Sequence, residues 1–140
     1  MDFVVPTSTP PPPVDVALPP RTTFWNAEAF DALGANDEKS MLIVLAGLAG
    51  GSNEIYLRSV LMPLCLDPPA NERWEACVIN ARGCALSEIT SGVLYNARAT
   101  WDVRQFVKWA RKQWPSRKMF ACGFSLGANI LVNVRKPVLN

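Results

Sequence analysis

One serine lies in a sequence context that would make it a nucleophile. The segment Gly123-Phe124-Ser125-Leu126-Gly127 has the spacing Gly-x-Ser-x-Gly, with an apolar run before it and a helix-compatible run after it. Small residues on both sides allow a sharp strand-to-helix turn that exposes the hydroxyl of Ser125. This context favours a nucleophile elbow. The alternative is a glycine-rich helix N-terminus in which the serine is an N-cap.

A serine nucleophile also needs N–H donors for the negative oxygen of a tetrahedral intermediate. The backbone N–H of Leu126 is one candidate, because it begins a helix whose dipole favours negative charge. A second glycine-rich segment, residues 46–52, follows another apolar run, and its Leu48 is the other candidate donor. The alternative for residues 46–52 is a flexible strand-to-helix turn. Since both turns follow strands of one expected sheet, we expect them to share a site.

The composition argues against several other chemistries. The 140 residues include four cysteines without C-x-x-C spacing and no histidine, so we expect no metal site and no cofactor. Cys77 and Cys122 lie in apolar runs and are expected to be buried, reduced thiols. The net charge of +2 comes from scattered basic residues, which does not favour a nucleic-acid partner. We expect no signal peptide, because residues 1–6 have no positively charged start and no long apolar stretch, and no apolar run in the sequence is long enough to predict a membrane span.

The elements that position these residues follow from apolar patterning. Short apolar runs at residues 41–46, 76–79 and 119–122 predict buried strands, and a helix is expected to start at Ser125. Between the strands, residues 54–65 and 100–114 predict helices. The alternation of strands and helices predicts an α/β fold, a parallel sheet with flanking helices.

The two inner helices have expected buried faces. Residues 54–65 place at helical spacing Ile55, Tyr56, Ser59, Val60, Pro63 and Leu64. Pro63 is expected to break the last turn of that helix. Residues 100–114 place on one stripe Val103, Phe106, Val107, Ala110 and Trp114.

Four segments are expected along the chain. Residues 1–5 resemble the end of an early strand, and residues 6–23 form a proline-rich loop, because residues 6–20 alone hold seven of the twelve prolines. Residues 24–134 form the α/β core up to the elbow and its helix. Residues 135–140 form a divergent tail that contains a helix-breaking proline.

Four successive blocks of sequence resemble the AB-hydrolase-4 family of α/β-hydrolases. These blocks are LAGLAGGSNE at residues 45–54, NARGC at 80–84, LYNARATWDVR at 94–104 and GFSLGANIL at 123–131. The fungal branch of this family includes medium-chain fatty-acid ethyl ester synthase/esterases. The resemblance implies a partial α/β-hydrolase fold and a serine esterase or acyltransferase. The substrate class that it implies is a small lipid ester or an acyl-CoA, in the cytoplasm or at lipid droplets or membranes.

The resemblance also implies roles for particular residues. Ser125 is implied as the nucleophile, with Leu48 and Leu126 as oxyanion donors and with Gly123, Phe124 and Gly127 completing the elbow. Asn80 and Arg82 are implied to support the end of a strand rather than to take part in the reaction. Asp102 is expected to be a solvated or helix-capping carboxylate, because the triad acid follows the nucleophile in family order.

The sequence departs from the family pattern where the other triad members are expected. The fifteen residues after Ser125 contain no acid, and the chain has no histidine, even at Ala46 and Asn53 where family members usually carry one. We therefore expect a fragment, cut at both ends, that is nearly inert. One alternative is a non-catalytic module that binds a partner through residues 6–20 or through Trp25. Another is an unstable chain whose unfinished sheet exposes an apolar edge.

Overall fold

Four strands form one sheet in the computed structural model, which describes residues 1–4, 26–31 and 38–134. The strands are β1 Asp2–Phe3, β2 Met41–Leu45, β3 Glu75–Ile79 and β4 Met119–Gly123, in the spatial order β1-β3-β2-β4. The three strands expected from apolar runs are parallel, and β1 pairs antiparallel with β3. The predicted α/β class is confirmed. The antiparallel direction of β1 was not part of the prediction.

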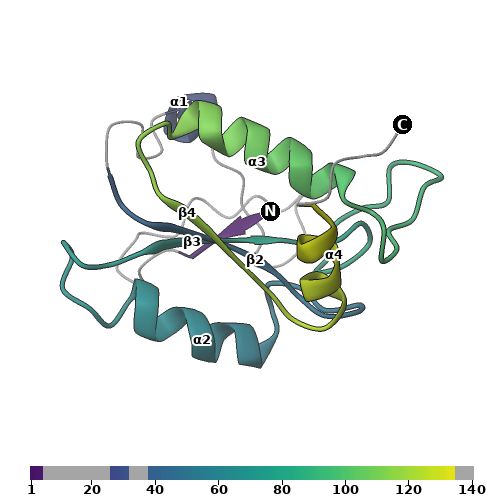
Figure 1. The fold of residues 1–140 in the computed structure, drawn as a ribbon, viewed down its shortest axis with the longest axis horizontal. Coiled ribbons are helices and arrows are strands. Elements are labelled where there is room, and N and C mark those ends of the chain that lie inside the picture. Colours follow the sequence, from purple (N-terminus) through teal and green to yellow (C-terminus); the bar gives the residue numbers. More distant parts are fainter. Residues whose placement is uncertain (5–25, 32–37, 135–140) are drawn as a thin grey trace.

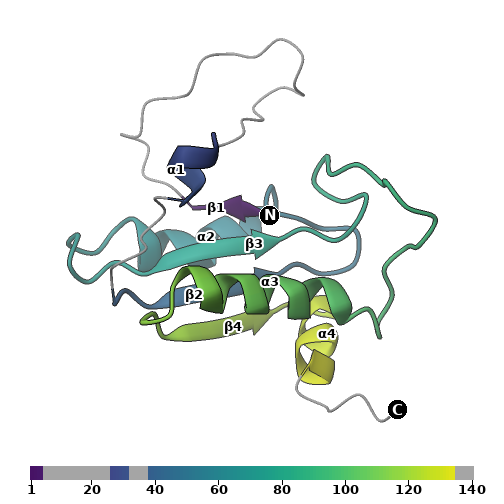
Figure 2. The same ribbon diagram turned by 90° about the horizontal axis from the view of Figure 1, so that it is seen from above.

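The helices lie on both faces of this sheet, as Figures 1 and 2 show. They are α1 Ala27–Asp31, α2 Ile55–Cys65, α3 Trp101–Gln113 and α4 Leu126–Val134. Helix α2 covers one face, whereas α3 covers the other, together with α4 at the carboxyl ends of the strands (Figure 1). A strand between two helical layers must be apolar on both faces, which is why the run at β2 is continuous rather than alternating.

The central strand β2 divides the core into two layers. All five of its residues are buried. Met41, Ile43 and Leu45 pack on the α3 side with Phe106 and Trp114. The other two residues of β2 face α2, in a cluster made of Leu42, Val44, Leu57, Leu61, Cys65, Ala76 and Val78. The alternation of side chains along a strand therefore supplies both cores from one five-residue run.

Helix α2 differs from its expectation in two ways. Its buried face is Leu57, Leu61 and Cys65, whereas Ile55 is 79% exposed. The predicted stripe with Ile55, Tyr56 and Val60 is therefore wrong, because the sheet contacts the adjacent face of the helix. The helix also continues through Pro63 to Cys65. A proline removes one hydrogen bond and introduces a local clash, and the burial of Leu61 and Cys65 against the sheet outweighs that cost in the last turn.

Helix α3 has the predicted buried stripe. Val103, Phe106 and Ala110 are buried, and the stripe ends on Trp114, which is 1% exposed. Beneath this helix the guanidinium of Arg117 lies over the Trp114 ring at 4.8 Å and pairs with Glu75 at 2.7 Å. Because Arg117 is buried, its charge needs such a partner. This pair ties the start of β3 to the turn before β4, at the amino ends of the parallel strands.

The carboxyl ends of the parallel strands stop at the same level. Leu45 is paired with Ile79 on one side and with Gly123 on the other. The turns that follow β2, β3 and β4 therefore begin side by side. This is the edge at which parallel α/β sheets carry their functional loops.

All four cysteines are free thiols. Cys77 is buried, as predicted, and burial raises its pKa to about 12. Cys122 is only half-buried, because β4 pairs with β2 alone among the described strands. The proline-rich loop at 6–23, Trp25 and the tail at 135–140 lie outside the described residues. Within the described residues, no helix has the length and apolar character that crossing a membrane requires.

Candidate active site

Ser125 lies between β4 and α4, in a strand–turn–helix element. Its φ is +50°, a left-handed conformation that side-chain-bearing residues rarely adopt, and its side chain is exposed. The turn is closed by a hydrogen bond from the N–H of Gly127 to the carbonyl of Phe124, at 2.8 Å. Such strain in a non-glycine residue is typical of functional positions. The serine is therefore presented at the carboxyl edge of the sheet as an elbow requires.

The two glycines of the elbow are required by close backbone approaches. A Cβ on Gly127 would lie 2.5 Å from the carbonyl oxygens of both Leu45 and Ala46, and a Cβ on Gly123 would lie 2.5 Å from the backbone nitrogen of Ala128. These contacts are with backbone atoms, which cannot rotate away as a side chain does. The first turn of α4 therefore packs directly on the end of β2, and only glycine fits there.

The glycine-rich segment after β2 lies against the elbow. A Cβ on Gly47 would be 3.6 Å from the Cβ of Ser125. The N–H of Phe124 donates to the carbonyl of Leu45 at 3.0 Å, which holds the two turns together. A surface depression contains the serine and is lined by Gly47, Leu48, Gly50, Glu54, Tyr56, Phe124 and Ser125. The structure thus brings together the two turns that the sequence analysis expected to share a site.

Two backbone N–H groups at this site have no hydrogen-bond acceptor among the described residues. They belong to Leu48 and to Leu126, whereas the neighbouring Gly47, Ala49 and Gly50 all donate. Leu126 is the first residue of α4, where helical N–H groups are left without intrahelical partners. Both N–H groups are available to an external acceptor. They are the two that the sequence analysis named as candidate oxyanion donors.

Sequence reasoning missed three side chains at this site. Tyr56 and Tyr95 contact the glycine-rich segment through their hydroxyls. Glu54 precedes α2 and is the one carboxylate that lines the depression. The apolar pattern placed Tyr56 in a buried stripe, and the nine-residue separation from Gly47 gave no local signal of a contact.

Asn80 supports the glycine-rich segment from the end of β3. Its Oδ1 accepts the N–H of Ser52 at 3.0 Å, and its Nδ2 donates to Asp2 Oδ2 at 2.8 Å. The Ser52 hydroxyl donates to the same Asp2 oxygen. This network connects β1, β3 and the segment after β2, which is the supporting role expected for Asn80.

Arg82 and Asp102 form a two-pronged ion pair. Nε and Nη2 of the arginine donate to the two carboxylate oxygens at 2.9 and 2.8 Å, and Nη1 donates to Ser91 Oγ at 2.7 Å. The hydrogen bond with Asp102 raises the pKa of the guanidinium. Asp102 lies in the first turn of α3 with its side chain 40% exposed, as expected for a solvated carboxylate at a helix start, but its pairing with Arg82 was not predicted. Through this pair and the bond to Ser91, Arg82 anchors the long segment between the end of β3 and α3, which agrees with the supporting role expected for it.

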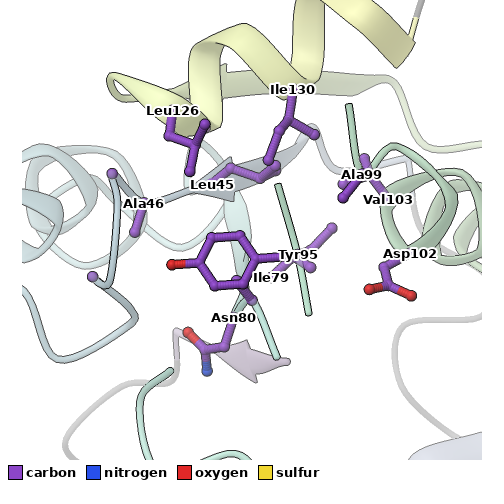
Figure 3. Close-up of a pocket in the computed structure, with 14 residues that line it drawn as sticks. Leu45, Ala46, Ile79, Asn80, Tyr95, Ala99, Asp102, Val103, Leu126 and Ile130 are labelled. Atoms are coloured by element: carbon purple, nitrogen blue, oxygen red, sulfur yellow. The ribbon is translucent and has the colours of Figure 1, made fainter. Parts of the chain in front are cut away.

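A second pocket lies behind the elbow, between the strand ends and the starts of α3 and α4 (Figure 3). Leu126 and Ile130 form one wall, Val103 and Ala99 another, and the Tyr95 ring lies across the space above Asn80. In Figure 3 the Tyr95 hydroxyl is directed toward the segment that begins at Ala46. This pocket is mostly apolar and contains no free ionisable group, because Asp102 is paired with Arg82.

A parallel sheet covered on both faces, with a strained serine after one strand and a glycine-rich turn after its neighbour, is the arrangement of the α/β-hydrolase class. Comparison with known proteins supports this class. The chain is 46% identical over 101 residues to a monoacylglycerol lipase of Saccharomyces cerevisiae, covering 72% of this chain and 22% of the relative. It is 37% identical over 116 residues to medium-chain fatty acid ethyl ester synthase/esterase 2 of the same yeast, covering 83% of this chain and 25% of the relative.

A human protein, monoacylglycerol lipase ABHD2, is 26% identical over 91 residues, which is 64% of this chain and 20% of the relative. The chain spans about a quarter of the length of the curated relatives it matches. No family model matches the chain. No solved structure matches it either. Over the part that it shares with these relatives, the chain belongs to the α/β-hydrolase family.

Proposed function

We propose that this chain carries the nucleophile and the oxyanion donors of a serine carboxylic-ester hydrolase or acyltransferase of the AB-hydrolase-4 type. Ser125 is the nucleophile, and Gly123, Phe124 and Gly127 complete its elbow. The observation that carries the proposal is the left-handed, exposed Ser125 beside the glycine-rich segment after β2. An N-capping serine would not require that geometry, because an N-cap residue adopts an extended conformation.

The proposed reaction begins with attack of Ser125 Oγ on the ester carbonyl. Negative charge then develops on the carbonyl oxygen, and N–H groups held ready for that charge lower the barrier. The N–H groups of Leu48 and Leu126 are the proposed donors, since neither has an acceptor among the described residues. The positive end of the α4 dipole adds to the stabilisation at Leu126. Collapse of the intermediate expels the alcohol or thiol of the substrate, which takes up the proton that a general base removed from Ser125. The acyl-serine that remains is resolved by water or by an alcohol.

The proposed substrate is a small lipid ester or an acyl-CoA. Relatives of this chain bear the names monoacylglycerol lipase and fatty acid ethyl ester synthase/esterase. The apolar side chain of Leu48 supports this class, because it lines the depression and is 73% exposed to solvent. An acyl chain would cover this side chain with a gain from the hydrophobic effect.

The general base is proposed to come from outside these 140 residues. The chain contains no histidine, and no acid follows Ser125. Loss of the base from a serine hydrolase costs on the order of a million-fold in rate, and roughly a thousand-fold acceleration over water remains from the oxyanion donors and binding. The chain alone is therefore expected to be nearly inert toward esters.

A fluorophosphonate reagent tests the nucleophile and the missing base together. The Ser125 Oγ–P bond forms as the P–F bond breaks, and the hydroxyl proton needs an acceptor, which imidazole added to the buffer supplies. We expect slow labelling of Ser125 by mass spectrometry without imidazole and a rate that rises with imidazole concentration. Ser125→Ala should lose the label. Ser116→Ala, which changes an exposed serine in the turn before β4, should retain it.

Two results would count against this function. Equal labelling of Ser125 and of other exposed serines would show that the elbow does not activate its hydroxyl. Fast labelling without imidazole would show that the chain holds its own base. The carboxylate of Glu54 is then the group to examine, because it lines the depression with Ser125. Glu54→Gln would abolish the fast reaction if that carboxylate is the base.

A further inference from the structure

The backbone of the glycine-rich segment after β2 is held by the hydroxyls of both tyrosines in the chain. The N–H of Gly47 donates to the hydroxyl of Tyr56 at 3.1 Å. The N–H of Ala49 donates to the hydroxyl of Tyr95 at 3.0 Å. The residue between them, Leu48, has an N–H without an acceptor among the described residues. The N–H groups of Gly47 and Ala49 are therefore hydrogen-bonded, and the N–H of Leu48 between them is available to an external acceptor.

Tyr56 connects this segment to the nucleophile elbow. Its hydroxyl accepts the Gly47 N–H, and its ring packs edge-on against Phe124, the residue before Ser125, with the centroids 4.9 Å apart. Tyr56 also lines the depression that contains Ser125. One rigid side chain therefore sets the distance between the glycine-rich segment and the serine. This explains why Tyr56 lies on the exposed side of α2 rather than in the core.

Tyr95 approaches from the opposite side, out of the long segment between β3 and α3. Its hydroxyl also accepts a hydrogen bond from the Cys84 thiol, with sulfur and oxygen 3.6 Å apart, and this contact raises the pKa of the phenol. The segment that carries Tyr95 is anchored by Arg82 to the first turn of α3. Figure 3 shows the Tyr95 ring spanning from the α3 side of the pocket toward the glycine-rich segment.

The glycine-rich segment needs such support, because it has no helical or strand hydrogen bonds of its own. It is closed locally by a bond from the Gly50 N–H to the Gly47 carbonyl at 3.1 Å. Ala49 has a φ of +58°, which is unfavourable for a residue with a Cβ. Without the Tyr95 hydroxyl, the Ala49 peptide would relax to a more common conformation, and the neighbouring Leu48 N–H would change direction with it.

We propose that Tyr56 and Tyr95 are positioning residues that hold the Leu48 N–H toward the oxyanion formed on Ser125. Each hydroxyl acts through the amide beside Leu48 and does not touch the reacting atoms. The proposal rests on the proposed function, because it takes Leu48 as an oxyanion donor. It adds that oxyanion binding depends on two phenols, one from the helix after the segment and one from a segment about forty-five residues further along the chain.

Tyr56→Phe and Tyr95→Phe test the proposal, because each removes one hydroxyl and keeps its ring. Amide hydrogen exchange measured by NMR on the 140-residue chain reports the hydrogen bonds directly. We expect exchange at Gly47 to accelerate about tenfold in Tyr56→Phe and exchange at Ala49 to accelerate similarly in Tyr95→Phe, as loss of one hydrogen bond predicts. Amides of the buried strand β2, such as Val44, serve as the control for folding and should not change.

The phosphonylated serine gives a second signature that a purely structural role would not produce. In the wild-type adduct the phosphoryl oxygen should shift the amide protons of both Leu48 and Leu126 downfield. Each tyrosine variant should lose the Leu48 shift and keep the Leu126 shift, since Leu126 is held by α4. Imidazole-assisted labelling of Ser125 should slow about tenfold or more in each variant, because complete loss of one oxyanion donor lowers a reaction rate by roughly a hundred-fold or more.

The two proposals fail in distinguishable ways. If the wild-type adduct shifts neither Leu48 nor Leu126, the oxyanion site and with it the proposed function are wrong, whatever the tyrosines do. If the wild-type adduct shifts both amides and the Tyr→Phe variants keep both shifts, the positioning role is overturned and the proposed function stands. Unchanged exchange at Gly47 and Ala49 in the variants would also overturn the positioning role.

Discussion

Gly127→Ala is the substitution whose effect the structure defines most sharply. The added Cβ would lie 2.5 Å from the carbonyl oxygens of Leu45 and Ala46, and separations under 3.0 Å are essentially never seen for real Cβ atoms. The start of α4 must therefore move away from β2 by at least about 0.5 Å. Both opposing atoms belong to the backbone of the central strand, so α4 has to give way.

The expected loss of stability combines two opposing effects. Overpacking of this kind costs up to about 3 kcal/mol. Alanine in place of glycine within a helix returns about 1 kcal/mol through helix propensity. The net prediction is a loss of about 2 kcal/mol, which corresponds to a fall of about 1 M in the urea midpoint for a chain of this size.

Urea unfolding followed by tryptophan fluorescence measures this loss. Gly92→Ala is the matched control, because nothing lies within 4 Å of the Cβ that it adds, and a change of less than about 0.5 kcal/mol is expected. Labelling of Ser125 should also slow in Gly127→Ala, because Ser125 immediately precedes the displaced helix. An unchanged urea midpoint for Gly127→Ala would refute the claim that α4 must approach β2 this closely.

Two further predictions concern the supports of the fold. Burial raises the pKa of Cys77 from 9.0 to about 12, so the folded chain keeps a neutral thiol where the unfolded chain ionises. Stability should therefore be intact below pH 9 and decrease between pH 9 and 12, with Cys77 contributing about 1.4 kcal/mol of the loss at pH 10. Urea midpoints of Cys77→Ala should show a smaller slope, which Cys65 maintains because burial raises its pKa to about 11. Arg82→Lys removes the two-pronged pair with Asp102 and the bond to Ser91, so trypsin should cut the segment between β3 and α3 faster than in the wild type. Lys108→Gln, on the exposed face of α3, is the control, and equal cleavage rates would show that Arg82 does not anchor this segment.

The sequence by itself determined the strands, the α3 face and the candidate elbow. Local spacing carries this information. A continuous apolar run such as β2 has to be buried on both faces, and Gly-x-Ser-x-Gly after a strand leaves few conformations for its serine. The resemblance to α/β-hydrolases rests on the same short blocks, and the relatives bear it out.

Only the tertiary structure decided which residues support those blocks. The exposed position of Tyr56 depends on the angle at which α2 meets the sheet, because two neighbouring faces of that helix are apolar. The pairing of Asp102 with Arg82 and the contact of Tyr95 with Ala49 join positions far apart in the chain. Sequence spacing does not encode such contacts. They depend on where the strand ends stop, and the aligned register of β2, β3 and β4 sets that level.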